Sequence, residues 1–217
     1  MISTPDGIRV YEYDQSRAQG VATRLIGADY RGVLSTDFYG GYNHLACRHQ
    51  RCWVHLLRDL VKLVERHGQD VRVRQWAVQL EATYRMAQQR LAQEPQLSLE
   101  ERGALATRLC ERVRVLGQQY AKAKNHPCRA LAQRVLRHAH ELFVFVEVEG
   151  VSADNNAAER SIRPVVVVRK ISGGTKSAKG SRTRFGLASL FETWQARGLN
   201  PFEACLNLLS QTPLPQI

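Results

Sequence analysis

The first part of the chain alternates short apolar segments with turn-forming residues. Residues 8–13 alternate apolar and polar side chains after a Pro5-Asp6-Gly7 turn, which is the pattern of a half-buried strand. Residues 1–4 are its expected hairpin partner. The other elements predicted here are a helix over 16–26, a strand over 32–36, a strand over 51–54 and a helix over 56–66.

From residue 70 to residue 145 the apolar side chains recur at the three- and four-residue spacing of helices. Ser98 and Glu101 have the spacing of a capping box, so a second helix should begin there, and a third should follow Pro127. The leucine and aromatic stripes of these helices are expected to form a hydrophobic core. The block is therefore predicted to be an all-helical insertion.

The last part of the chain is predicted to be mostly helical. A helix that contains Glu159 should start after Ala153, and Pro164 should break or kink it. The Val165–Val168 run fits a strand or a helix equally well. Two more helices are expected, one capped by Ser181 and reaching Arg197, and one opened by Asn200-Pro201.

Charge points to an anionic partner, because the chain carries 31 lysines and arginines against 20 acids, a net charge of +11. The excess of positive charge is concentrated between residues 160 and 184, where eight basic residues occur and no acidic residue does. They are Arg160, Arg163, Arg169, Lys170, Lys176, Lys179, Arg182 and Arg184. Glycines within this run favour phosphate binding, and an ordinary solvated face is the alternative.

Other compositional features narrow the protein class. No apolar run approaches the ~20 residues that a membrane-spanning helix needs, so no membrane partner is expected. The five cysteines are odd in number and scattered, which favours a reducing compartment over a disulfide framework. A cytoplasmic location is therefore predicted.

Two acids stand where they could do chemistry. Asp37 ends a short apolar strand and is followed by glycines, which suits a side chain pointing into a crevice. Its alternative interpretation is a turn residue that caps the next segment. Glu159 stands near a helix start beside the basic run, and its alternative is an acid favoured there by the helix dipole.

Three sequence runs occur in an order that resembles the transposases of insertion sequence family 66. They are GVLSTDFYGGYN, CWVHLLRDL and NNAAERSIRPVVVVRKISGG, and the resemblance extends from about Thr4 to Leu209. It implies a DDE-type enzyme of the α/β class. The implied fold is an incomplete ribonuclease H-like core with an all-helical insertion before the last catalytic acid. The implied division is a front part of the core over 1–68, the insertion over 69–150, and a C-terminal part of the core over 151–217.

The same resemblance implies roles for individual residues. Asp37 and Glu159 match catalytic acids that hold metal ions, Mg²⁺ or alternatively Mn²⁺, about 3.5–4 Å apart for strand cleavage and transfer. The implied partner is DNA, at the element ends and the target, bound by a homo-oligomer. The matching signature around Glu159 includes Asn156, Arg160, Arg163 and the Arg169-Lys170 pair. The predicted DNA-binding residues are these four cations together with Lys176, Lys179 and Arg182 of the basic run.

The chain also departs from the family pattern. The first catalytic aspartate of the family lies on a strand upstream of the hairpin, and this sequence starts too late to contain it. A DNA-binding remnant that associates with an intact transposase is therefore a second hypothesis, and a helical RNA-binding protein is a third.

Two local motifs have competing interpretations. Cys52 and His55 have a spacing compatible with zinc, although packing between a strand and a helix is the default because no second ligand pair follows. The loop over 172–180 is rich in glycine and lysine and precedes a helix, so it suits a DNA phosphate or a flexible surface loop.

Overall fold

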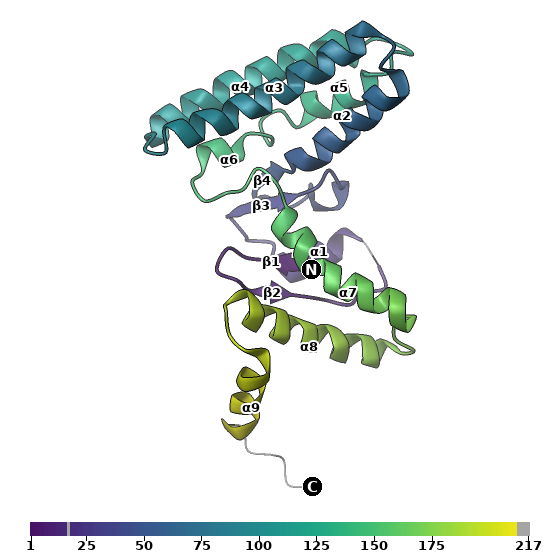
Figure 1. The fold of residues 1–217 in the computed structure, drawn as a ribbon, viewed down its shortest axis with the longest axis vertical. Coiled ribbons are helices and arrows are strands. Elements are labelled where there is room, and N and C mark those ends of the chain that lie inside the picture. Colours follow the sequence, from purple (N-terminus) through teal and green to yellow (C-terminus); the bar gives the residue numbers. More distant parts are fainter. Residues whose placement is uncertain (17, 212–217) are drawn as a thin grey trace. The chain divides into compact units, whose positions relative to one another are not determined.

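The computed structural model describes residues 1–16 and 18–211 (Figure 1). It divides into two compact units, one formed by Ala18–Asn155 and the other by Met1–Arg17 together with Asn156–Ile217. Both units are rich in helix, and each of them contains a two-stranded sheet. This mixture of helices and small sheets agrees with the α/β class.

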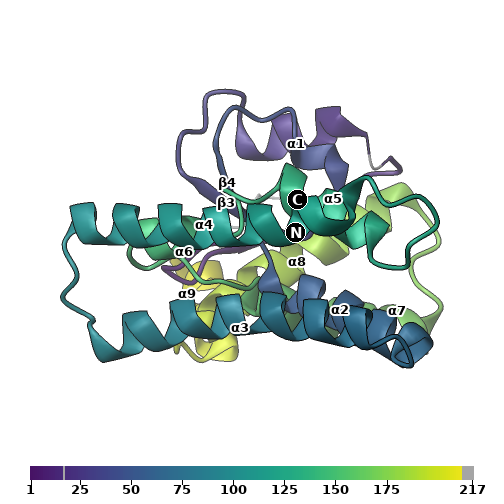
Figure 2. The same ribbon diagram turned by 90° about the horizontal axis from the view of Figure 1, so that it is seen from above.

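The Ala18–Asn155 unit combines a parallel sheet with a helical bundle. Its elements are α1 (Gln19–Ile26), β3 (Val33–Thr36), the 3-10 helix η1 (Gly40–Tyr42), β4 (Arg48–Arg51), α2 (Trp53–His67), α3 (Val71–Gln93), α4 (Leu99–Ala121), α5 (Arg129–Arg137) and α6 (Val144–Glu147). Strands β3 and β4 are parallel, with Val33 opposite Arg48 and Thr36 opposite Arg51. Seen from above, α3 and α4 run side by side along the length of the bundle (Figure 2).

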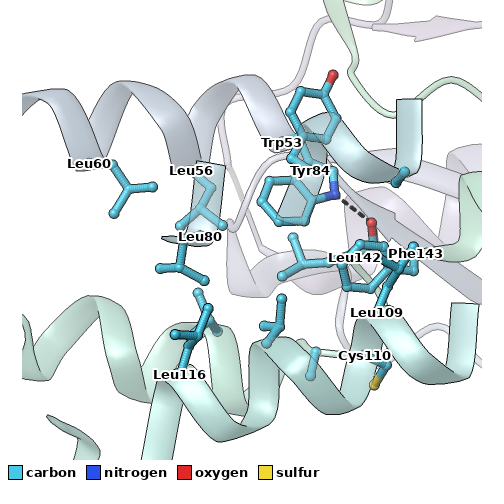
Figure 3. Packing of buried hydrophobic residues seen from close by; sticks show 14 of the residues in the cluster. Trp53, Leu56, Leu60, Leu80, Tyr84, Leu109, Cys110, Leu116, Leu142 and Phe143 are labelled. Carbon is cyan, nitrogen blue, oxygen red and sulfur yellow. Dashed lines mark hydrogen bonds between the residues drawn. The ribbon is translucent and has the colours of Figure 1, made fainter. Parts of the chain in front are cut away.

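The core of this unit lies between α2, α3, α4 and α5, where the predicted apolar stripes meet (Figure 3). Trp53 is fully buried, stacks on Tyr84 with ring centroids 4.9 Å apart, and donates its indole N–H to the carbonyl of Leu142 at 2.6 Å. Trp76 is buried in the same way and donates to the carbonyl of Leu116 at 2.9 Å. Each buried indole N–H thus has an acceptor, so neither leaves a polar group unsatisfied.

The prediction that residues 70–145 are mostly helical is confirmed, since α3 to α6 occupy most of this range. The capping box is also confirmed: the Ser98 hydroxyl accepts from the Glu101 N–H, and the Glu101 carboxylate accepts from the Ser98 N–H. These two hydrogen bonds satisfy backbone donors that have no partner inside the first turn of α4.

The strand predicted over 51–54 is misplaced, because β4 ends at Arg51 and α2 starts at Trp53. The strand residues His49, Gln50 and Arg51 are polar but buried, so an apolar pattern did not reveal them. Gln50 shows how such a residue is tolerated in the core. Its amide donates to the Leu142 carbonyl, and its oxygen accepts from the Phe145 N–H at 2.8 Å.

The second unit is made of a hairpin and three helices. Its elements are β1 (Ile2–Ser3), β2 (Arg9–Val10), α7 (Asn156–Ser172), α8 (Ala178–Ala196) and α9 (Pro201–Gln211). The predicted hairpin is present, with Ile2 opposite Val10 in an antiparallel pair, although each strand is shorter than expected. The helix opened by Asn200-Pro201 is confirmed, because the Asn200 side chain accepts from the Phe202 N–H at 2.9 Å.

Hydroxyl groups of α8 bind the backbone that continues β2. Thr193 accepts from the Arg9 N–H at 3.0 Å and donates to the Arg9 carbonyl. Ser189 accepts from the Tyr11 N–H at 2.9 Å. Residues four apart on a helix rise ~6 Å and residues two apart on a strand advance ~6.6 Å, so the two spacings nearly match. The helix therefore supplies hydrogen-bond partners in place of another strand.

Two features of this unit differ from the sequence prediction. Of the break or kink predicted at Pro164, the break is absent, since α7 is continuous and includes Val165–Val168; a proline removes one backbone donor, and the hydrogen bonds before and after it hold the helix. Ser177 caps α8 in place of Ser181, with its hydroxyl accepting from the Gly180 N–H at 3.0 Å. Gly180 lies in this first turn, and because glycine has a low helix propensity, the sequence pattern did not predict a helix there.

Replacing Trp53 by alanine should lower the free energy of unfolding by about 3–5 kcal/mol, because a fully buried aromatic side chain is lost and a cavity remains. Urea unfolding followed by circular dichroism measures this change. Val61→Ala is the matched control, since Val61 is 57% exposed and its loss should matter little. Equal unfolding midpoints for the two variants would contradict the assigned core.

Candidate active site

Asp37 lies at the carboxyl end of β3, directly after the buried Thr36. One of its carboxylate oxygens accepts a hydrogen bond from the Tyr39 N–H at 2.9 Å. This contact is the turn-stabilising bond that the alternative interpretation of Asp37 expects. The second oxygen has no hydrogen-bond partner among residues 1–16 and 18–211, so it remains open to a cation.

Arg51 holds the backbone that carries Asp37. Its side chain is only 1% exposed. One terminal guanidinium nitrogen donates to the Thr36 hydroxyl at 3.0 Å and to the Asp37 carbonyl at 3.1 Å. The other donates to the Asn43 side chain at 2.6 Å. Three contacts from one rigid, planar group therefore fix the end of β3 and the loop that follows.

The charge of Arg51 is balanced by Glu141, which accepts from the Arg51 Nε and from the His138 ring at 2.9 Å. Burial by itself would raise the pKa of Glu141, but the hydrogen bonds from His138 and Arg51 outweigh it and lower the pKa to about 2. Glu141, which lies just after α5, is thus the ionised partner of Arg51. Sequence reasoning missed this network, and the only signal for it was an arginine in a strand position between buried residues.

An aromatic contact also holds the loop that carries Asp37. Phe38, the residue after Asp37, packs edge-on against the His138 ring with centroids 5.6 Å apart. The Arg134 guanidinium lies 5.1 Å from the centre of the Phe38 ring and pairs with Asp59 at 2.5 Å. The helices of this unit therefore position the Asp37 loop through both polar and aromatic contacts.

Glu159 occupies the first turn of α7, where the helix dipole favours an acid. It belongs to the unit that contains α7, α8 and α9, whereas Asp37 belongs to the other unit. The meeting of the two carboxylates at one metal site therefore stays a prediction.

All seven predicted DNA-binding residues are exposed on α7, on α8 or in the loop between them. Lys179 and Arg184 line an open hollow of about 500 Å³ at the start of α8, together with Ser177 and Thr183. One guanidinium nitrogen of Arg184 is buried and has no hydrogen-bond partner in the described part of the chain. The start of α8 thus combines cations with a hollow that a polar group can enter.

The Cys52 motif has the packing role that was its default interpretation. The Cys52 sulfur is buried and accepts from the Asn155 N–H at 3.4 Å, and burial raises the pKa of the thiol. Within residues 1–16 and 18–211, no three His, Cys, Asp or Glu side chains gather as ligands of a metal ion. The same residues contain no helix that is both long enough and apolar enough to cross a membrane.

Comparison with known proteins adds the decisive observation. The model of the transposase IS66 family matches residues 2–183, a range that includes Asp37, Glu159 and all seven predicted DNA-binding residues. The chain belongs to the IS66 transposase family. The family match ends before Leu209, the expected limit of the resemblance, so it leaves out most of α8 and all of α9.

Two curated relatives of this IS66 chain come from Sinorhizobium fredii (strain NBRC 101917 / NGR234). The uncharacterized protein y4qI is 28% identical over 93% of this chain and 39% of its own length. The uncharacterized protein y4jD is 26% identical over 93% of this chain and 41% of its own length. The chain thus spans about two-fifths of the length of these relatives. No solved structure gives a significant match.

Replacing Glu141 by glutamine should reduce stability by about 3 kcal/mol at neutral pH, because Arg51 would remain buried without its anionic partner. The pKa of Glu141 is depressed in the folded protein, so its contribution is complete above the usual value of 4.5 and is lost as pH falls toward 2. The difference between wild type and variant should shrink over that window. Urea unfolding at several pH values measures it, with Glu111→Gln, on an exposed face of α4, as the control. A difference that does not depend on pH would contradict the assigned ion pair.

Proposed function

We propose that this chain is the catalytic segment of an IS66 transposase, which cleaves DNA at element ends and transfers the strands to a target in a metal-dependent reaction. The observation that carries this proposal is the family match over residues 2–183. Both candidate acids and the basic run fall inside the matched range, so this chain has counterparts for two of the acids and for the cations that the proposed chemistry uses.

Asp37 and Glu159 are the proposed ligands of Mg²⁺, or of Mn²⁺. Carboxylate oxygens are the hard donors that these ions prefer, and Asp37 keeps one oxygen open. A pair of such ions, when bound, lowers the pKa of an attacking water or hydroxyl and stabilises the leaving oxygen. A further metal-binding aspartate, which the family places on a strand before the hairpin, would come from sequence outside these 217 residues.

The other residues of the site have supporting roles. Arg51 binds the Asp37 carbonyl and the Thr36 hydroxyl, so it keeps the Asp37 carboxylate at the end of β3. The exposed basic run is the proposed contact for the phosphates of the DNA, and its positive charge would lower the cost of bringing a polyanion next to acids. A ribonuclease H-like core, in which β3 and β4 are neighbouring parallel strands, is the fold proposed for this arrangement.

Asp37→Asn and Glu159→Gln should each reduce Mg²⁺-dependent strand cleavage by the full-length transposase at least ~100-fold, the usual scale for removing a group that stabilises transition-state charge. DNA binding should persist, because the proposed role of both acids is to hold metal ions, and the basic run is the proposed contact for phosphates. The assay is cleavage of a labelled duplex that carries an element end, with binding measured in parallel. Asp29→Asn and Glu203→Gln, two exposed acids, are the matched controls. Normal cleavage by either active-site variant would remove that acid from the proposed site.

The double variant Arg163→Gln/Lys170→Gln should bind DNA more weakly and with a smaller dependence on salt. Each lost phosphate contact lowers the slope of log affinity against log salt by about 0.9. Fluorescence anisotropy of a labelled duplex at several salt concentrations measures the slope. Arg85→Gln/Arg90→Gln removes the same charge from arginines that are already paired with Glu81 and Glu94, so it should change the slope little. Equal slopes for the two double variants would show that only net charge matters.

A further inference from the structure

One end of the helical bundle brings two turns of the chain together. The α2–α3 turn and the α4–α5 turn lie at the same end, opposite the α3–α4 turn (Figures 1 and 2). Ring contacts connect them: Trp76 of α3 packs edge-on against Tyr120 of α4 at 5.9 Å, and Tyr120 stacks on His126 of the α4–α5 turn at 4.1 Å. This region, residues 65–74 and 120–129, is called the turn end below.

The turn end carries a concentration of positive charge. Its exposed cations are Arg66, Arg72, Arg74, Lys122, Lys124 and Arg129. Only two carboxylates, Glu65 and Asp70, lie in the same two segments, and Asp70 is bound to Arg72 at 3.0 Å. The opposite end is close to neutral, because Glu94, Glu100 and Glu101 around the α3–α4 turn are accompanied by Arg90 and Arg102. The bundle is therefore electrically polarised along its length.

Ion pairing is one difference between the turn end and the sides of the bundle. On the sides, some exposed arginines are neutralised by nearby acids: Arg85 pairs with Glu81 at 2.6 Å, and Arg114 pairs with Glu111 at 3.8 Å. Arg108 and Arg112 of α4 are exposed and have no ion pair within the described part of the chain. At the turn end, five cations have no ion pair within residues 1–16 and 18–211. They are Arg66, Arg74, Lys122, Lys124 and Arg129. Their charge is left for solvent or for a partner.

The composition of the turn end favours a phosphate backbone over other anionic partners. Val71, at 49% exposure, is its only large apolar side chain that is exposed among the residues described, whereas protein interfaces need an apolar centre depleted in charge. Tyr120 is already packed between Trp76 and His126. It is therefore not a platform on which an unpaired base could stack. A double helix, which presents phosphates at regular spacing and needs no apolar contact, fits best.

We propose that the turn end of the bundle binds the phosphate backbone of duplex DNA, as a second contact distinct from the basic run of α7 and α8. The proposal rests on the proposed function, since it assumes that the transposase binds DNA. It gives the helical insertion a part in holding the DNA in addition to positioning the Asp37 loop. Because no base-reading contact is involved, the turn end should add affinity and salt dependence without adding sequence preference.

The triple variant Arg66→Gln/Lys124→Gln/Arg129→Gln tests this contact in the full chain. Binding to a short labelled duplex is followed by fluorescence anisotropy at several salt concentrations. The dissociation constant should rise at least ~10-fold at moderate salt, and the salt slope should fall by about 2–3. The matched control is Arg85→Gln/Arg90→Gln/Arg114→Gln, which removes the same formal charge from side chains paired with acids. This control should change the dissociation constant by less than ~3-fold.

The outcomes separate this proposal from the proposed function. Unchanged binding by the turn-end variant, with weakened binding by Arg163→Gln/Lys170→Gln, would overturn the second contact and leave the transposase assignment standing. Equal losses in the turn-end and control variants would also overturn it, because net charge alone would explain them. An absence of DNA binding by the wild-type chain would overturn both proposals.

Further measurements test whether the triple variant is folded and whether the contact is electrostatic. Circular dichroism melting of the triple variant should match that of wild type, since all three side chains are exposed. Charge reversal by Lys124→Glu alone should weaken DNA binding further than Lys124→Gln, and the reverse order would contradict an electrostatic contact. Sedimentation without DNA tests whether the turn end binds a second copy of this chain instead. A change in oligomeric state in the triple variant would assign the surface to that contact.

Discussion

A buried guanidinium constrains the architecture of the larger unit. Arg51 ends β4 inside the protein, and an isolated charge there would cost several kcal/mol. Among residues 1–16 and 18–211, the only carboxylate bound to it is Glu141, ninety residues later in the chain. The two side chains can meet only if the helical segment folds back onto the sheet. This requirement links the helices, the two strands and the loop that carries Asp37 into one body.

In the smaller unit, the backbone of a very short hairpin has to be stabilised. Two-residue strands make few hydrogen bonds, and a lone hairpin is marginally stable in water. Thr193 and Ser189 of α8 bind the backbone of Arg9 and Tyr11, and the Tyr11 hydroxyl donates to the Ser161 carbonyl of α7. Hydroxyl groups on helices thus replace the neighbouring strand that a larger sheet would provide.

Periodicity predicted the bundle helices and the capping box well, because these features depend on residues close together in sequence. It misplaced β4, since His49, Gln50 and Arg51 are buried against partners that lie ninety or more residues away or in the loop before β4. A break or a kink was also expected at Pro164, and α7 continues through this residue without a break. The predicted three-part division at residues 68 and 150 and the metal role of Asp37 and Glu159 stay predictions.

The sequence by itself determined the family, the two candidate acids and the basic run, because these features can be recognised from residue types and their order without knowing any contacts. Only the tertiary structure decided that Arg51, Glu141, His138 and Phe38 hold the Asp37 loop, and that the unpaired cations of two distant turns share one end of the bundle. The physical reason is that burial and ion pairing are properties of neighbours in space. An arginine in a strand and a lysine in a turn look the same in sequence whether they are neutralised or not.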